Sequence, residues 1–215
     1  MARVDGEEGR GRGLTGESRD PSRRRPAGAR SVTYTPRMPF VLRALDAATS
    51  PDFDDVMRRA SGAAARCLCT AAYVPSWQHP SLARPCRERL LEEGRSDGYL
   101  LYDGEAPVGW CQAAPRDDLP QFAARSHGID PGPGVFAVTC LVLVPEARRR
   151  GTSPEFLRLV IDELRRRGAR SVHAFAHRYG PGEDTSEFVE FPESLCPRAG
   201  MTLLQEHATR PMYGA

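Results

Sequence analysis

The chain has 215 residues, a formal net charge of +2 and 40% hydrophobic residues. This length is enough for one domain with a buried core, and no apolar run reaches the roughly 18 residues that suggest a membrane-spanning helix. We therefore expect a folded, mixed-composition protein that does not enter a membrane. All 30 basic residues are arginine, since the sequence contains no lysine.

Residues 1–37 differ in composition from the rest of the chain. They are rich in Gly, Arg, Ser and Pro, and carry nine Arg against five acidic residues. Such a segment buries too little apolar surface to order itself, so we predict a disordered tail over 1–37 and one folded domain over 38–215. The folded part is left slightly acidic. This balance argues against a nucleic-acid partner, although Arg23, Arg24 and Arg25 keep that alternative open.

The cysteine pattern favours reduced thiols and a cytoplasmic location. No secretory segment precedes the six cysteines, and most of them lie in apolar or helical contexts. Cys67 and Cys69 are separated by one residue, a spacing that metal sites also use. Because no second close pair and no histidine accompanies them, we interpret them as packing residues and expect no metal.

The first half of the folded part predicts antiparallel strands mixed with helices. An Asp103-Gly104 turn between two apolar runs is a strong hairpin signal. Trp110, on the second strand of that hairpin, is predicted to lie in the core rather than in a substrate cavity. The predicted elements, in order, are a strand at 40–45, a helix at 50–59, a small-residue segment at 63–74, a helix at 82–93, and strands at 98–102 and 107–113.

The stretch 135–175 organises the chain. The unbroken apolar run 135–144 predicts a strand buried on both faces. A helix follows, with Ser153 as the expected N-cap and Pro154 as its first residue. Gly168 is the expected C-terminal stop. The strand at 171–176 should then run parallel to the first, because a helix crosses over between them.

The last part of the chain predicts one more helix and two closing strands. His173 and His177 alternate onto one face of the preceding strand, the helix should run from about 185 to 195, and the strands fall at 201–206 and 208–212. The fold class is therefore α/β, with about seven strands in a mixed sheet and about four helices.

The loop between the central strand and its helix carries three arginines and one glycine. A helix N-terminus presents unpaired N–H groups and a positive dipole, for which phosphate or pyrophosphate is a natural ligand. Arginines beside it add fork-shaped donors. The alternative is an ordinary crossover with a solvated basic turn.

Two segments resemble the GNAT superfamily of N-acyltransferases. The loop PEARRRGTS (145–153) resembles its acyl-CoA loop, written Arg/Gln-x-x-Gly-x-Gly/Ala after a buried strand. Arg148 and Gly151 match this pattern, whereas Ser153 stands where Gly or Ala is usual. LCPRAGM (195–201) resembles a later helix end of the same family.

This resemblance implies a GNAT-like central sheet and an acyl-CoA-dependent N-acetyltransferase, with acetyl-CoA as co-substrate. It implies that the strand backbone at Leu141, Val142 and Leu143 holds the pantetheine arm, and that the loop holds the pyrophosphate. The expected cofactor-binding residues are Leu141, Val142, Leu143, Arg148, Arg149, Arg150, Gly151, Thr152 and Ser153.

The residues that move the proton are harder to identify from the resemblance. Many members place Glu on the central strand, where this chain has Thr139, and Tyr near the last helix end, where it has Cys196. Neither Thr139 nor its neighbour Cys140 is a plausible base at its ordinary pKa. Water could relay the proton, or a nearby side chain could accept it. The candidates are His177, Glu190, His173 and Glu187, with His177 and Glu190 as our choice.

Several functions remain open on the sequence. The leading hypothesis is acyl transfer to a small-molecule amine by direct attack, with no acyl group on a cysteine. Transfer to a protein amino group comes second. A module that binds CoA without transfer, or an acyl-CoA decarboxylase on the same fold, would belong to different classes. The sequence also leaves a homodimer open.

Overall fold

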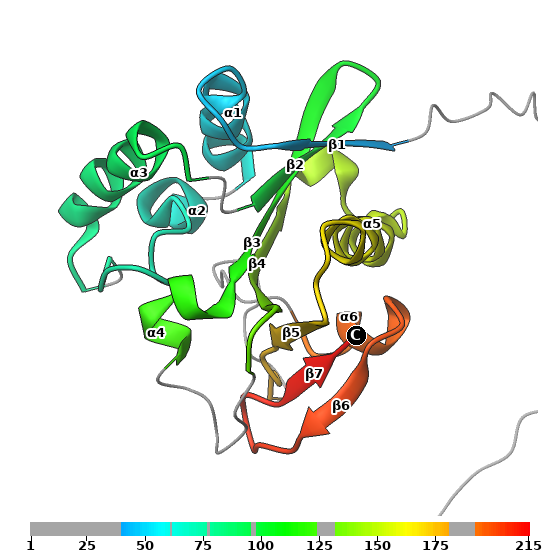
Figure 1. Ribbon diagram of the computed structural model, residues 1–215. Helices are drawn as coiled ribbons and strands as arrows, with labels where there is room; N and C mark the ends of the chain where they lie inside the picture. The colour runs from blue at the N-terminus through cyan, green and yellow to red at the C-terminus, as the bar shows by residue number, and fades with distance from the viewer. Residues whose placement is uncertain (1–39, 61, 77, 96–97, 124–131, 181–191) are drawn as a thin grey trace, which may run out of the picture. The chain divides into compact units, whose positions relative to one another are not determined.

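The computed structural model describes residues 40–60, 62–76, 78–95, 98–123, 132–180 and 192–215 (Figure 1). The tail predicted over 1–37 lies outside these ranges. So do Glu187 and Glu190, together with most of the helix predicted from about 185.

The seven strands form one mixed sheet in the order β1-β2-β3-β4-β5-β7-β6. Every neighbouring pair is antiparallel except β4 and β5, which are parallel. This confirms the predicted α/β class and the parallel crossover at its centre. The strands are β1 (Phe40–Ala44), β2 (Gly98–Asp103), β3 (Ala106–Pro115), β4 (Val135–Leu143), β5 (Ser171–Phe175), β6 (Thr202–Gln205) and β7 (Met212–Gly214).

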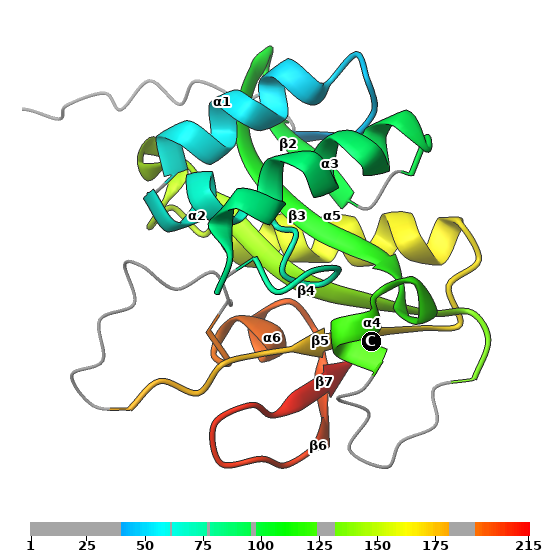
Figure 2. The ribbon, with the colours of Figure 1, turned by 90° about the vertical axis from the view of Figure 1, so that its left-hand side faces the viewer.

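Helices cover both faces of this sheet. Figures 1 and 2 show α1, α2 and α3 on one face, and α5 and α6 on the other. Figure 2 looks onto the face with α1–α3, behind which α5 runs along the sheet. The helices are α1 (Ser50–Ala60), α2 (Gly62–Cys67), α3 (Ala83–Glu92), α4 (Pro120–Ala123), α5 (Thr152–Arg166) and α6 (Leu195–Arg198).

Apolar periodicity places the core as expected. The indole of Trp110 is fully buried and packs edge-on against Phe53, with ring centroids 4.8 Å apart, so Trp110 is a core residue. On the other face, α5 buries one apolar stripe against β3, β4 and β5. Its stripe consists of Phe156, Leu157, Val160, Ile161 and Leu164.

The start of α5 differs from the prediction. The helix begins at Thr152 and its N-cap is Gly151, whose φ of 76° is left-handed, so Ser153 is not the cap. A glycine tolerates this conformation, which turns the loop directly into the helix. Pro154 then lies in the first turn, where its missing N–H costs nothing because those amides have no partner within the helix.

Two predicted elements near the C-terminus are also corrected. The helix does not continue to Leu195 from upstream, because Pro192 forms a parallel bridge with His177 and α6 starts only at Leu195. The last strand is not 208–212 but Met212–Gly214. The Nδ1 atom of His207 accepts the backbone N–H groups of Thr209 and Arg210, which folds that segment into a turn.

Candidate active site

The parallel strands β4 and β5 separate in the middle of the sheet. They pair from Val135 with Ser171 to Val138 with Ala174. Beyond that rung β4 continues to Leu143, paired with β3 on its other side as far as Gly109. Among the described residues, no strand pairs with the β5-facing edge of 139–143. The family resemblance implies that the pantetheine arm lies along this edge, at Leu141, Val142 and Leu143, and the carbonyl oxygen of Leu143 already accepts a hydrogen bond from Arg148.

The loop after β4 leads directly into the N-terminus of α5. It starts with a 3₁₀ turn at Pro145–Ala147, and Arg149 then adopts a left-handed φ of 59° before Gly151 does the same. Arg149 and Arg150 are exposed. Thr152 is buried, whereas Ser153 is half-buried. Exposed guanidinium groups thus stand beside the first-turn amides of a 15-residue helix, an arrangement that suits a pyrophosphate.

Arg148 has a different position from its two neighbours. Its Nε donates to the carbonyl oxygen of Leu143 at 2.9 Å, and its Nη2 donates to the carbonyl oxygen of Ala60 at 2.6 Å. The side chain therefore connects the loop to the end of β4 and to the end of α1. It holds the loop in place through these two carbonyl oxygens, although the residue as a whole is exposed, like Arg149 and Arg150.

A β-bulge lies where the two strands separate. Gln112 pairs with Cys140 and Ala113 pairs with Val138, so Thr139 is the extra residue of β4. The hydroxyl of Thr139 donates to Oε1 of Gln112 at 2.7 Å, and Nε2 of Gln112 donates to the carbonyl oxygen of Cys69 at 2.6 Å. All three are almost fully buried. This chain of hydrogen bonds fixes Thr139 on the face that α1–α3 cover, and sequence reasoning did not find it.

The predicted base His177 lies just beyond β5. Its ring packs against Tyr179 with centroids 4.4 Å apart, and its carbonyl oxygen accepts the N–H of Glu193. Glu190, the second choice, lies outside the described residues. His177 and Thr139 both belong to the segments that border the opening between β4 and β5.

A second polar cluster next to His177 ties the end of β5 to β7 and α6. Arg178 donates to both carboxylate oxygens of Glu193, at 2.6 and 2.7 Å, and the hydroxyl of Tyr213 donates to Glu193 at 2.7 Å. The hydrogen bonds from Arg178 lower the pKa of Glu193 to about 2, while burial and Glu193 raise the pKa of Tyr213 to about 12. Glu193 is thus too weak a base for an ammonium proton, and the cluster is structural.

His173 lies on β5, below the opening, and is buried. Its Nδ1 lies 3.4 Å from Nη1 of Arg116. Burial lowers the pKa of His173, and the positive charges of Arg116 and Arg170 lower it further. His173 is therefore neutral near pH 7 and is held within the sheet.

Cys140, next to Thr139, and Cys196, near the end of the last helix, are also buried. Burial and the nearby carboxylate of Glu193 raise the pKa of Cys196 to about 12. The pKa of Cys140 is raised well above its usual value by its hydrogen bond with Cys69 and by burial. Both thiols stay protonated near pH 7, which makes them poor nucleophiles.

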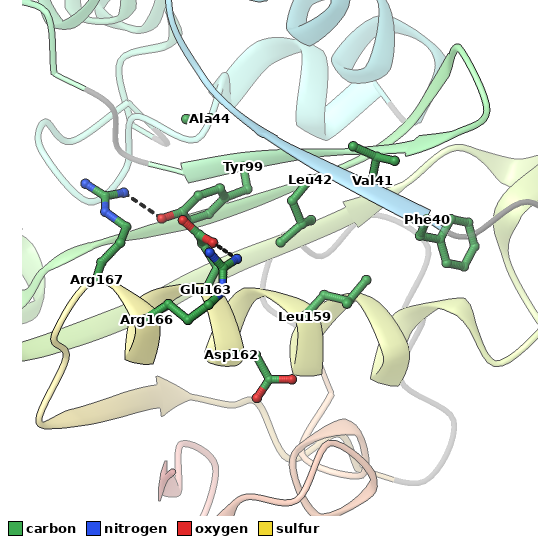
Figure 3. A pocket seen from close by; sticks show the side chains of 10 residues that line it. All are labelled: Phe40, Val41, Leu42, Ala44, Tyr99, Leu159, Asp162, Glu163, Arg166 and Arg167. Carbon is green, nitrogen blue, oxygen red and sulfur yellow. Dashed lines mark hydrogen bonds and ion pairs between the residues drawn. The ribbon is translucent and has the colours of Figure 1, made fainter.

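A groove of about 650 Å³ lies on the α5 side of the sheet, between β1 and α5 (Figure 3). Phe40, Leu42 and Leu159 line it. At one end the guanidinium of Arg167 donates to the hydroxyl of Tyr99 at 2.6 Å. None of the lining residues belongs to the 145–153 loop or to the bulge, so this groove is separate from the candidate active site.

A mixed sheet with one parallel pair at its centre, and a basic loop that leads into a helix, is the arrangement that the resemblance to GNAT enzymes implies. The sequence profile of the acetyltransferase (GNAT) family matches residues 63–180, which is more than half of the chain. The chain therefore belongs to the GNAT family and is an acyl-CoA-dependent N-acetyltransferase, with acetyl-CoA as its co-substrate.

Two solved structures illustrate the shared fold. A GNAT family N-acetyltransferase from Escherichia coli, in complex with CoA, superimposes with a TM-score of 0.51 at 16% identity, covering 84% of this chain and 82% of that one. The mosquito protein arylalkylamine N-acetyltransferase like 5b superimposes with a TM-score of 0.50 at 13% identity, covering 82% of this chain and 99% of that one. Comparison with curated protein sequences finds no match.

Two further findings concern metals and membranes. In the part of the chain that the structure describes, no group of three or more His, Cys, Asp or Glu side chains is placed to hold a metal ion. No helix within those ranges is long and apolar enough to cross a membrane.

Proposed function

We propose that the protein transfers an acetyl group from acetyl-CoA to the amine of a small molecule by direct attack. The observation that carries this proposal is the opening of β4 from β5 beyond Val138, with the 145–153 loop at the far end of β4. A site of this kind can hold a long, phosphorylated thioester along one strand, so its reactive end lies near the bulge.

For the cofactor, we propose that each part of the loop has one role. The exposed Arg149 and Arg150 contribute charge, and the left-handed Gly151 lets the backbone approach the pyrophosphate closely. Thr152 and Ser153 contribute first-turn amides. Arg148 holds the loop through its two carbonyl partners rather than by binding the phosphates directly.

For the amine, we propose that Thr139 is the group on the central strand that contacts it. The Thr139 hydroxyl donates its hydrogen bond to Oε1 of Gln112. The lone pairs of the Thr139 oxygen therefore remain able to accept an N–H. Thr139 can thereby orient the amine but cannot remove its proton. The slight negative charge of the folded part suits a cationic amine arriving from solution.

Acetyl-CoA supplies an activated acyl group and a thiolate leaving group that is stable without a strong acid. The amine must lose a proton before or during attack. We propose His177, directly or through water, as the acceptor, because histidine is the commonest general base and His177 lies just beyond β5. Glu190 remains the second candidate.

The test is an assay of acetyl transfer from acetyl-CoA to a panel of amines, in which the release of free CoA thiol is measured. The panel contains arylalkylamines, polyamines, amino sugars and short peptides with a free N-terminus. We expect turnover with at least one small amine at micromolar to millimolar KM. Turnover with peptides alone would replace the small-molecule substrate by a protein amino group. Absence of turnover, with CoA binding intact, would remove the transferase proposal.

A further inference from the structure

The thiols of Cys69 and Cys140 face each other at the bulge. Their Sγ atoms lie 2.9 Å apart, although the residues are 71 positions apart in sequence. Both side chains are almost fully buried, with 2% and 3% exposed. The sulfurs of a disulfide lie roughly 2.0 Å apart. A bond between these two would therefore require the sulfurs to approach by less than about 1 Å.

The position of Cys69 is held by the surrounding framework. Leu68 and Cys69 both have a left-handed φ of 48°, an uncommon conformation for residues other than glycine. The buried guanidinium of Arg87 donates to the carbonyl oxygen of Leu68 at 2.9 Å. Gln112 donates to the carbonyl oxygen of Cys69 at 2.6 Å. The turn that carries Cys69 is thus kept against β4, and its thiol stays opposite Cys140.

We propose that Cys69 and Cys140 are a modification site, an oxidisable thiol pair that forms a reversible disulfide with hydrogen peroxide as the oxidant. One thiol is first oxidised to a sulfenic acid as the peroxide O–O bond breaks and water leaves. The second sulfur then attacks the sulfenic sulfur and releases a second water. Two thiols lose two electrons and two protons, and the hydrogen peroxide takes them up. Burial makes the reaction slow, so small oxidants are required.

Disulfide formation would act on the amine end of the active site, and this part rests on the proposed function. Cys140 follows Thr139 directly, and Cys69 supplies the carbonyl that orients Gln112. Drawing the two sulfurs together moves both anchors of the Thr139 hydroxyl. The loop at 145–153 makes no contact with this pair in the described hydrogen bonds. Oxidation should therefore change KM for the amine and leave CoA affinity unchanged.

The experiment is an intact-mass time course of the full chain with hydrogen peroxide, read without reference to activity. We expect a species lighter by two hydrogen atoms that dithiothreitol reverses, and a proteolytic fragment that links Cys69 to Cys140. The variants C69S and C140S should lose this species, whereas C196S, which removes another buried thiol, should keep it. Thermal melting of each variant checks that it folds.

Access of the oxidant to the buried pair is controlled by a second arm. The chain is unfolded, reduced and refolded with oxidised glutathione, so that the thiols meet the oxidant before burial. A link between Cys69 and Cys140 in either arm supports the proposal. A species lighter by two hydrogen atoms that persists in C140S, or the absence of a Cys69–Cys140 link in both arms, would overturn it. Amine KM is measured only on protein proven oxidised by mass, so a failed transferase assay cannot be confused with a failed disulfide.

Discussion

The hydroxyl of Thr139 and the side-chain amide of Gln112 form a 2.7 Å hydrogen bond across the bulge between β3 and β4. The bond joins two buried groups at the level where β4 separates from β5. It places a hydroxyl where many related enzymes are expected to carry a carboxylate. In the proposed mechanism this hydroxyl orients the amine, and the base comes from another element.

Replacing Thr139 with valine should affect both folding and turnover. Thr139→Val leaves Oε1 of Gln112 without its donor, which should lower the free energy of unfolding by about 1–2 kcal/mol in urea. Loss of the amine contact should lower kcat/KM for the amine roughly tenfold, as expected for one hydrogen bond of ordinary strength. Thr139→Ser keeps the hydroxyl and is the matched control. Equal losses in both variants would show that the hydroxyl has no such role.

Replacing Arg148 should mainly affect stability, whereas replacing Arg150 should mainly affect CoA binding. Arg148→Ala removes the donor to the carbonyl oxygens of Leu143 and Ala60, so the free energy of unfolding should fall by about 1–3 kcal/mol. Arg150→Ala should leave stability within about 0.5 kcal/mol. It should weaken CoA binding, most clearly at low salt, because an exposed charge is screened. Chemical unfolding and calorimetry on both variants distinguish the two roles. An Arg148→Ala variant as stable as the parent would contradict the role of Arg148 in holding the loop.

Stability should depend on pH through His173. Its pKa is lowered in the folded state, so below pH 6.5 the unfolded chain binds a proton that the folded chain does not. Stability must therefore rise with pH between the lowered folded pKa and about 6.5. We expect the melting temperature of the parent to fall on acidification through this window, and His173→Gln to reduce that fall. An unchanged pH profile in the variant would show that other groups carry it.

No cysteine should carry an acyl group during turnover. Burial raises the pKa of Cys196 to about 12, so its thiolate is scarce at neutral pH. Incubation with acetyl-CoA alone should leave the intact mass unchanged, and kinetics should require both substrates together. An acetyl adduct that disappears in Cys196→Ala would instead establish a covalent, ping-pong route.

The sequence predicted those features that depend on local pattern. The apolar run before Pro145 and the apolar stripe on α5 were enough to predict the central crossover. The Asp103-Gly104 turn was enough to predict the hairpin of β2 and β3. The predicted N-cap of α5 was wrong. The sequence Gly-Thr-Ser-Pro fits a Ser153 cap followed by Pro154, but it fits equally well a left-handed Gly151 cap with Pro154 within the first turn.

The contacts at the bulge could not be predicted in the same way. Gln112, Thr139 and Cys69 meet only because β3, β4 and the turn after α2 converge, and no spacing in the sequence indicates this. The end of the β4–β5 pairing at Val138 was not predicted, and the family resemblance implied only that the backbone at 141–143 holds the pantetheine arm. The cluster of Arg178 and Glu193 likewise depends on tertiary contacts.

The most direct test of the acyl-CoA site is the calorimetric affinity of CoA for Gly151→Glu beside Gly104→Glu. Both glycines have a left-handed φ, 76° and 63°, and an added Cβ at either meets no atom within 4 Å, so backbone strain and added charge are matched. Gly104 lies in the β2–β3 turn, away from the loop. We predict that Gly151→Glu loses CoA binding while Gly104→Glu retains the affinity of the parent. Equal affinity in both variants would contradict the assignment of the 145–153 loop as the pyrophosphate site.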